Sequence, residues 1–224
     1  MNTGVVALCA VLGALAGAVV LVPALRTIPE RWDPTPRARW SVVIANGLLW
    51  ALVANRFSHG WVLLPYFVVF SVLLAVSVVD LRLYRIPDRF VFPGLLLTVI
   101  LVVLASFLVA PTSSDAVSAI RFAGAGLLTY FGILFFFHLV YPRGMGFGDV
   151  KLALLMGLSL GWLGTSYFTA IYLVLIALFF GCVFGIVFGL AWRIIQRRGG
   201  AFPFGPALAA AVIFVVLTRD HWVV

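Results

Sequence analysis

The chain has 224 residues, of which 64% are hydrophobic and only 10% are charged, and its mean hydropathy is +1.20. These values exclude an ordinary soluble domain and are typical of a helical protein that crosses the bilayer several times. The net charge of +8 is spread over short connections between apolar stretches. That distribution predicts contact with lipid headgroups and excludes a gathered nucleic-acid-binding face.

Eight apolar stretches follow one another along the chain, and short polar connections separate them. A helix needs roughly 20 apolar residues to cross the hydrocarbon layer, and most of the stretches approach that length. We therefore expect an all-α fold: a polytopic membrane helix bundle with about eight transmembrane helices, of which the second and sixth are short. The expected crossings are 4–25, 40–54, 61–79, 90–110, 119–140, 150–164, 167–190 and 204–218.

Basic residues predict the orientation, because short cytoplasmic loops retain positive charge. With eight crossings and the N-terminus outside, twelve basic residues fall on one side and three on the other. Deleting either short crossing would move the basic loops that follow it to the wrong side, which supports keeping both. We assign the cytoplasm to the side with Arg26, Arg31, Arg37, Arg39, Arg82, Arg85, Arg89, Arg143, Lys151, Arg193, Arg197 and Arg198, and the outside to the side with Arg56, Arg121 and Arg219.

The chain divides into two membrane regions without a soluble domain. Residues 1–59 are expected to form an N-terminal hairpin, and residues 60–224 a larger membrane domain. The connection 26–39 between the first two crossings is too short and too rich in proline to fold by itself. The first crossing carries its arginines after the apolar run rather than before it, so we expect an anchor and not a cleaved signal peptide.

Three of the seven acidic residues lie at the predicted cytoplasmic ends of helices. Asp80 directly follows an apolar run, and Asp149 has the same expected depth on another helix. An acidic side chain at a membrane boundary is costly and indicates a function. Asp88 follows Pro87 and precedes the next apolar run, which suits a helix N-cap.

Two aspartates at one depth meet a requirement of peptide hydrolysis by paired carboxyl groups. One ionised carboxylate removes a proton from water, while the other, kept protonated, donates to the carbonyl oxygen and then to the leaving amine. Neighbouring like charges cannot both ionise, so the pair would titrate as a unit. Asp149 also ends the sequence Gly146-Phe147-Gly148-Asp149, and such glycines let a backbone approach an extended substrate closely.

The same residues are compatible with other functions. Boundary aspartates cap helices or pair with loop arginines, and glycines are frequent in membrane helices. A transporter would use Asp80 and Asp149 as a proton or cation site with the glycines as a hinge. An assembly scaffold that has lost its chemistry would need neither carboxylate. Replacing either aspartate by Asn discriminates, because a protease should lose all cleavage in both single variants, whereas a scaffold should keep supporting assembly.

Two further polar residues lie near these aspartates. The ammonium of Lys151 would either favour an ionised Asp149 or bind a lipid phosphate. His138 lies in an apolar stretch and is expected to be a hydrogen-bonded residue of the bundle. Because His59 and His221 fall on the opposite side, we expect neither a metal site nor a cofactor.

Three motifs carry a resemblance to a known family. Residues 144–152 read GMGFGDVKL and are followed by Gly157 and Gly161, residues 80–88 read DLRLYRIPD, and residues 202–208 read FPFGPAL. In this order they resemble the signature of the prepilin peptidases, the bacterial members of the GxGD aspartyl proteases. The resemblance covers residues 60–218 and fits this family better than the presenilin-like GxGD proteases.

The resemblance implies that Asp80 and Asp149 are the catalytic pair of a prepilin or pseudopilin peptidase in the inner membrane. Such enzymes cut the leader on the cytoplasmic side, usually after a glycine and just before the hydrophobic helix of the substrate. It also implies a substrate-binding or site loop formed by Gly146, Gly148, Lys151, Pro203, Gly205 and Pro206.

The sequence departs from the family in two respects. Many members also methylate the new N-terminal amine, and their first helix carries a serine and an asparagine that are absent from residues 17–23 here. The Cys-x-x-Cys pairs that hold zinc in larger members are absent as well. The sequence thus predicts peptidase activity and gives no support for methylation or for a zinc-binding insert.

Overall fold

The structure is a computed structural model that describes residues 2–27, 35–142, 144–196 and 202–222. The predictions made for Arg31, Arg143, Arg197 and Arg198 fall outside these ranges. All regular structure in the described ranges is helical, which confirms the predicted all-α class. The helices are α1 (Thr3–Ala16), which continues through the π-helical segment η1 (Gly17–Leu21) into α2 (Val22–Arg26), then α3 (Pro36–Arg56), α4 (Gly60–Leu83), α5 (Asp88–Val109), α6 (Ser113–Val140), α7 (Phe147–Gly161), α8 (Tyr167–Gln196) and α9 (Gly205–Thr218), followed by the short 3-10 helix η2 (Arg219–His221).

Five of the described helical segments are long and apolar enough to cross a membrane: Thr3–Arg26, Gly60–Leu83, Asp88–Val109, Ser113–Val140 and Tyr167–Ile194. Helices α7 and α9 have 15 and 14 residues. At about 1.5 Å per residue they are shorter than the hydrocarbon layer, which is roughly 30 Å thick. The count of eight crossings and the outside N-terminus therefore stay predictions.

Short polar caps explain where several helices begin. The Thr35 hydroxyl accepts the N–H of Ala38 at 3.4 Å, and Pro36 occupies the first helical position of α3. At the start of α6, the Thr112 hydroxyl accepts the N–H of Asp115 at 3.1 Å and donates to its carboxylate at 2.7 Å. These local signals lie in the connections, so the apolar runs between them form uninterrupted helices.

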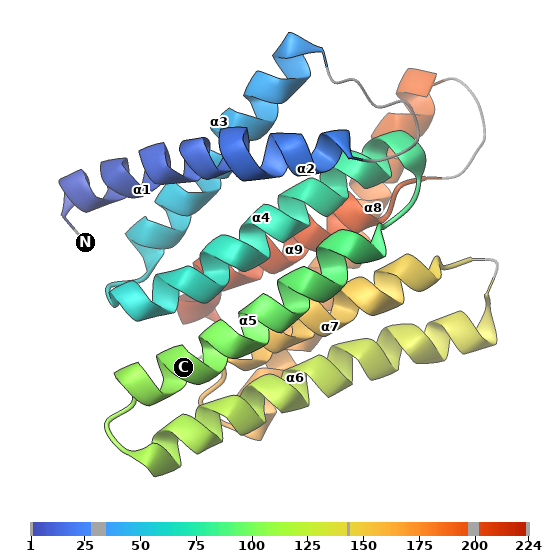
Figure 1. Cartoon of the computed structure of the whole chain (residues 1–224). Helices are drawn as coiled ribbons and strands as arrows, with labels where there is room; N and C mark the ends of the chain where they lie inside the picture. The colour runs from blue at the N-terminus through green and yellow to red at the C-terminus, as the bar shows by residue number, and fades with distance from the viewer. Residues whose placement is uncertain (1, 28–34, 143, 197–201, 223–224) are drawn as a thin grey trace.

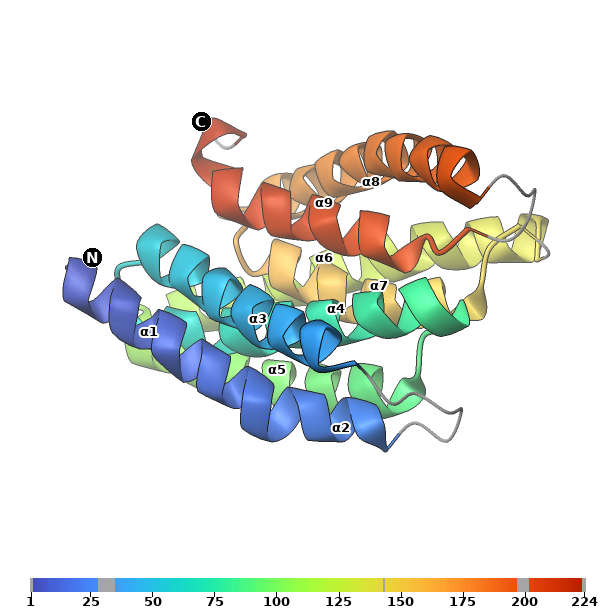
Figure 2. The same ribbon diagram turned by 90° about the horizontal axis from the view of Figure 1, so that it is seen from above.

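The helices run side by side as a bundle (Figures 1 and 2). The C-terminal ends of α2, α4, α6 and α8 all lie at one end of the bundle, and the start of α1 and the end of α9 lie at the other. We call the first end the connection end. Eight described basic residues lie on or beside it, whereas Arg56, Arg121 and Arg219 belong to the opposite end. The arrangement agrees with the side-to-side charge bias read from the sequence.

Helix α4 lies at the centre of the bundle. In its most apolar window 56% of the residues are buried, compared with 22–33% in the other four candidate spans. The short helices α7 and α9 are also mostly buried and pack against α4. The outer faces of α1, α5, α6 and α8 expose many large apolar side chains, as expected of surfaces that meet lipid.

Glycines bring α6 and α7 into close contact. A Cβ atom added to Gly157 would meet the carbonyl oxygen of Gly126, and one added to Gly161 would meet that of Phe122. No side chain fits between the two backbones at these points, which is how small residues stabilise helix pairs in membranes. The start of α7 is therefore held at a fixed height beside α6.

A polar network joins the N-terminal hairpin to the centre. The Asn46 amide donates to the carbonyl oxygen of Gly13 at 2.8 Å and accepts from the Ser71 hydroxyl at 2.8 Å. The Trp50 indole donates to the same hydroxyl at 3.0 Å. These bonds connect α1, α3 and α4 where the apolar surroundings offer few other partners.

Candidate active site

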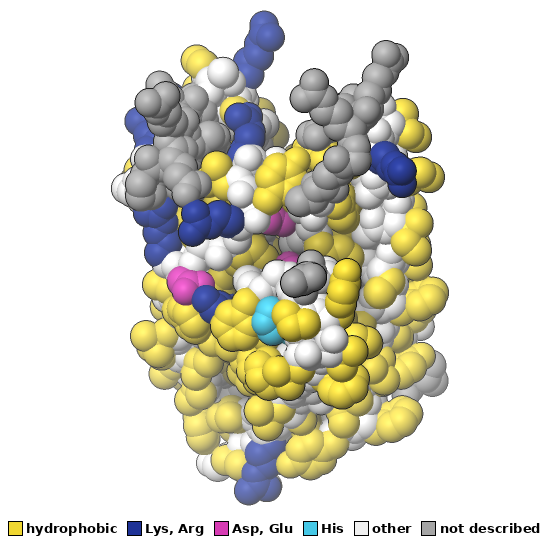
Figure 3. Space-filling model, turned by 90° about the vertical axis from the view of Figure 1, so that its right-hand side faces the viewer, with side chains coloured by type: hydrophobic (Ala, Val, Ile, Leu, Met, Phe, Trp, Pro, Cys, Tyr) yellow, Lys and Arg dark blue, Asp and Glu magenta, His cyan; other side chains and the backbone are white. Residues whose placement is uncertain are grey.

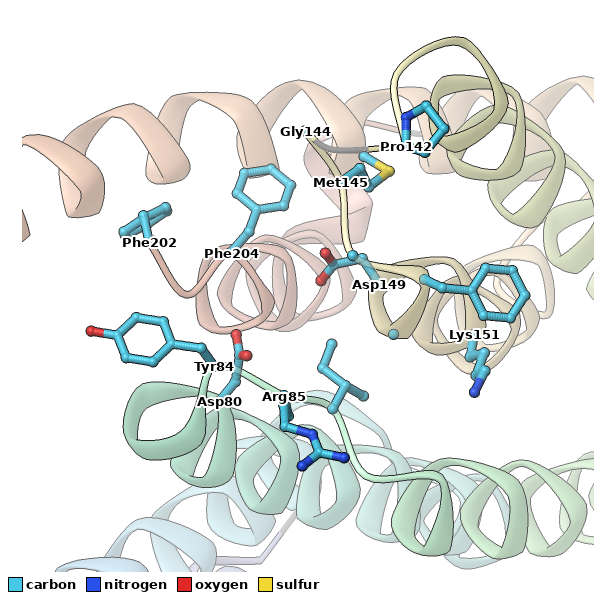
Figure 4. Close-up of a pocket in the computed structure, with 14 residues that line it drawn as sticks. Asp80, Tyr84, Arg85, Pro142, Gly144, Met145, Asp149, Lys151, Phe202 and Phe204 are labelled. Atoms are coloured by element: carbon cyan, nitrogen blue, oxygen red, sulfur yellow. The ribbon is translucent and has the colours of Figure 1, made fainter. Parts of the chain in front are cut away.

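A cavity of about 550 Å³ opens at the connection end and contains both predicted aspartates. Figure 4 shows Asp80 and Asp149 on opposite walls with their carboxylates directed into the same space. On the space-filling surface, lysines and arginines gather at this end around a hollow in which acidic atoms are recessed (Figure 3). The cavity is lined by Asp80, Tyr84, Arg85, Ile86, Pro142, Gly144, Met145, Gly146, Phe147, Gly148, Asp149, Lys151, Phe202 and Phe204.

Asp80 lies in the last full turn of α4 and is 5% exposed. The backbone N–H of Gly205, the first residue of α9, donates to its Oδ2 atom at 3.0 Å. Helix α4 ends at Tyr84, which adopts a left-handed conformation (φ 52°, ψ 37°) and donates its N–H to the Asp80 carbonyl oxygen at 2.9 Å. Asp80 is thus held by its own helix end and by the start of α9.

Asp149 lies in the first turn of α7, outside the five candidate spans, and is 8% exposed. Gly146 is the N-cap residue, and its carbonyl oxygen accepts the N–H of Asp149 at 3.1 Å. Burial and, to a smaller extent, the nearby Asp80 carboxylate together raise the pKa of Asp149 to about 7. Asp149 therefore retains a proton at a pH where an exposed aspartate is ionised.

Gly205 and Gly148 lie where a side chain would disturb the site. A Cβ atom on Gly205 would lie 2.8 Å from Oδ2 of Asp80, and one on Gly148 would lie 2.8 Å from Cβ of Ile86. Gly146 has more room, because its nearest neighbour would be the Asp149 carboxylate at 3.5 Å. The predicted glycines are thus all at the site, and two of them allow close approach.

The prolines of the third motif do not line the cavity. Pro203 is buried, and Pro206 faces a separate groove between α3, α4 and α9. Their neighbours Phe202 and Phe204 form part of the wall instead. Of the three residues predicted from this motif, Gly205 alone hydrogen-bonds to Asp80.

Lys151 and Asp88 bind each other. The Lys151 ammonium donates to Oδ1 and Oδ2 of Asp88 at 2.7 and 2.8 Å. The prediction that Asp88 is an N-cap was wrong: the N-cap of α5 is Pro87, no side chain caps it, and Asp88 is the first helical residue. The carboxylate of Asp88 binds Lys151 on α7 instead of the N–H groups of its own helix.

Two residues of the site carried no clear signal in the sequence. Tyr84 occupies a left-handed position that glycine or asparagine usually fills. Ile86 lies beside Gly148, which precedes Asp149, and beside Gly205, which hydrogen-bonds to Asp80. The prediction for His138 was correct in that its Nδ1 atom donates to the Met145 carbonyl oxygen at 2.9 Å. That bond fixes the segment between α6 and α7.

The arrangement suits proton transfer. The carboxyl groups of Asp80 and Asp149 face a shared, partly enclosed cavity. In such a pair one group can act as an acid and the other as a base toward a polar group bound between them. In the described part of the chain, no three His, Cys, Asp or Glu side chains are grouped to hold a metal ion.

Comparison with known proteins gives a consistent set of relatives. A family model described as the type IV leader peptidase family matches residues 67–190. Relatives named prepilin leader peptidase/N-methyltransferase include those of Pseudomonas putida (34% identical over 184 residues; 80% of this chain and 58% of the relative), Stutzerimonas stutzeri (31% over 182 residues; 80% and 58%) and Bacillus subtilis (30% over 179 residues; 79% and 64%). The chain thus spans less than two thirds of the length of these relatives. No solved structure matches it.

Proposed function

Because the chain belongs to the type IV leader peptidase family, we propose that it is a membrane aspartyl endopeptidase that cleaves the leader peptide of prepilins or pseudopilins. One observation carries the proposal: Asp80 and Asp149 come from separate helices, are both buried, and line the same cavity. Paired carboxyl groups of unequal protonation are what hydrolysis by general acid and general base requires.

In the proposed mechanism Asp80 is the base and Asp149 the acid. The N–H that Gly205 donates to Asp80 interacts more strongly with a carboxylate than with a neutral carboxyl group. Asp149 has a pKa of about 7, so it holds the proton that must be given away. Asp80 removes a proton from water as the water attacks the scissile carbonyl carbon, and Asp149 protonates the carbonyl oxygen. The tetrahedral intermediate collapses as Asp149 takes a proton back from one of its hydroxyl groups and passes it to the leaving nitrogen. The new carboxylic acid then reprotonates Asp149, and Asp80 releases to the free amine the proton that it took from water.

The glycine-rich segment before Asp149 is proposed to hold the substrate backbone. Gly144 and Gly146 line the cavity without side chains, so an extended peptide can lie against their main-chain groups. Tyr84, Phe202 and Phe204 offer apolar and aromatic surface on the facing wall. Such a site selects the substrate by an extended backbone and by apolar side chains near the cut.

The basic connection end is proposed to face the cytoplasm from the inner membrane. Positive residues that flank membrane helices favour that side, and the cavity opens at this end. The product would then enter pilus biogenesis or protein secretion. The proposal covers the peptidase reaction alone, because the serine and asparagine expected in the first helix for methylation are absent from residues 17–23.

The decisive experiment compares prepilin processing by wild-type protein, Asp80→Asn, Asp149→Asn and Asp115→Asn in detergent. Asp115 is a matched control, because it is an exposed aspartate in the first turn of α6 at the far end of the bundle. We expect wild type and the Asp115 variant to shorten the substrate on a gel and the other two to leave it intact. Cleavage by either active-site variant would refute the assignment. A wild-type protein that cleaves no prepilin would favour the transporter or scaffold.

A further inference from the structure

The ion pair between Asp88 and Lys151 joins the two segments that carry the proposed catalytic residues. Lys151 is two residues beyond Asp149 on α7. Asp80 lies in the last turn of α4, which ends at Leu83, and Asp88 begins α5. Both oxygens of the Asp88 carboxylate accept from the ammonium, at 2.7 and 2.8 Å. The pair therefore links α5 to α7 beside the cavity without touching either proposed catalytic carboxylate.

The segment between Asp80 and Asp88 is short and constrained, so a shift of Asp88 also shifts Asp80. Only residues 84–87 separate α4 from α5. Tyr84 is held in a left-handed conformation and hydrogen-bonded to the Asp80 carbonyl oxygen at 2.9 Å. Pro87 fixes the backbone that leads into α5. A displacement of Asp88 would accordingly move the end of α4.

Ile86 is packed between the two walls in the same segment. A Cβ atom on Gly148 would lie 2.8 Å from Cβ of Ile86, and one on Gly205 would lie 3.4 Å from its Cδ1 atom. These glycines adjoin Asp149 and the hydrogen bond to Asp80 respectively. The side chain of Ile86 thus separates the two walls. An attraction between α5 and α7 would keep this side chain packed against both glycines.

Two aromatic rings fix the ammonium in place. Lys151 lies 5.2 Å from the ring centre of Phe147 on α7 and 5.8 Å from that of Phe92 on α5, within the range of cation–π attraction. The lysine side chain is 23% exposed and that of Asp88 is 52% exposed. Ion pairs this exposed contribute little to global stability, so stability alone does not account for the geometry.

We propose that the Asp88–Lys151 pair is a positioning clasp that sets the separation of Asp80 and Asp149. Neither residue of the clasp is a catalytic residue; each acts through the segment that it holds. The expected effect of the clasp on cleavage rests on the proposed peptidase function. Its expected effect on the local order of the backbone rests on the fold alone.

The kinetic test is a double-mutant cycle on prepilin cleavage. Asp88→Asn and Lys151→Met should each lower kcat by about tenfold or more, because a shift of roughly 1 Å at reacting groups is that costly, while KM changes less than about twofold. The double variant should be no slower than either single one, and Lys151→Arg should retain most of the activity. A wild-type kcat in both singles, or losses that multiply in the double variant, would overturn the clasp.

The matched control is the ion pair at the opposite end of the bundle. Arg56 donates to Asp220 at 2.6 Å, with exposures of 20% and 70%, and also lies over a phenylalanine ring. Arg56→Gln and Asp220→Asn should leave kcat unchanged. A comparable loss of kcat in this pair would show that removal of any such ion pair disturbs the protein, and would contradict a positioning role.

Hydrogen exchange tests the clasp without a substrate. Amides of residues 84–91 and 147–152 should exchange faster in Asp88→Asn and Lys151→Met than in wild type, and at the wild-type rate in Lys151→Arg. Unchanged exchange in the first two variants would refute the clasp whatever the kinetics. Faster exchange in a protein that cleaves no prepilin would support the clasp and reject the peptidase proposal, so the two failures are distinguishable.

Discussion

Replacement of Gly205 by Ala tests whether the start of α9 holds Asp80 in a reactive position. The added Cβ atom would lie 2.8 Å from Oδ2 of Asp80 and 3.4 Å from both Cγ of Asp80 and Cδ1 of Ile86. Ordinary contacts of a Cβ atom begin near 3.4 Å, so the carboxylate must move by about 0.6 Å. Misplacement on the order of 1 Å costs about a hundredfold in rate, and we expect kcat to fall by about ten- to a hundredfold.

The fold should tolerate this change. Gly205 has a negative φ angle, since no described glycine has a positive one, and alanine is favoured over glycine in helices by about 0.5–1 kcal/mol. Steady-state cleavage of prepilin should be measured together with the thermal unfolding midpoint. Gly124→Ala is the control, because a Cβ atom on Gly124 in α6 would meet nothing within 4 Å. A Gly205→Ala variant with wild-type kcat would refute the reasoning, and a variant with a lower unfolding midpoint would show that its effect is not confined to Asp80.

Two further predictions follow from the packing and the protonation of the site. Gly157→Leu should lower the free energy of unfolding by at least about 1–3 kcal/mol, because even a Cβ atom there would meet the carbonyl oxygen of Gly126. The control is Gly132→Leu, because a Cβ atom on Gly132 would meet nothing within 4 Å. Equal unfolding midpoints for the two variants would contradict the prediction. Since the pKa of Asp149 is raised to about 7, its proton is present below that pH and lost above it, so kcat should decline on the alkaline side with a midpoint near that value. A kcat that stays flat across neutral pH would exclude Asp149 as the acid.

The sequence was sufficient to predict the helical class and to single out both aspartates. In a membrane protein, long hydrophobic runs predict helices directly, because every backbone N–H and C=O group inside the bilayer must be hydrogen-bonded within the protein. Asp80 and Asp149 were found because acidic residues are rare in such a chain, and the structure brings them to one cavity. Pro203 and Pro206 were included only through their motif, and neither lines the cavity.

The tertiary partners could not be predicted from local patterns. Asp88 next to Pro87 has the pattern of a helix cap, yet its partner is Lys151, 63 residues away. Tyr84 has no local feature that indicates a left-handed turn, because that conformation is imposed where α4 stops. Ile86 contacts Gly148 and Gly205, which belong to two other segments of the chain. The hydrophobic periodicity of a single segment cannot predict such tertiary contacts.

The different lengths of α6 and α7 determine what can reach the proposed catalytic residues. From the contact of Gly126 with Gly157, α6 continues to Val140, whereas Asp149 lies much nearer to that contact in the first turn of α7. At about 1.5 Å per residue, these distances are about 21 Å and about 12 Å, so Asp149 lies about 9 Å below the end of α6. An extended chain covers that depth with about three residues. A folded domain does not fit into a cavity of about 550 Å³, so the proposed cleavage would require the region around the cleavage site to be extended.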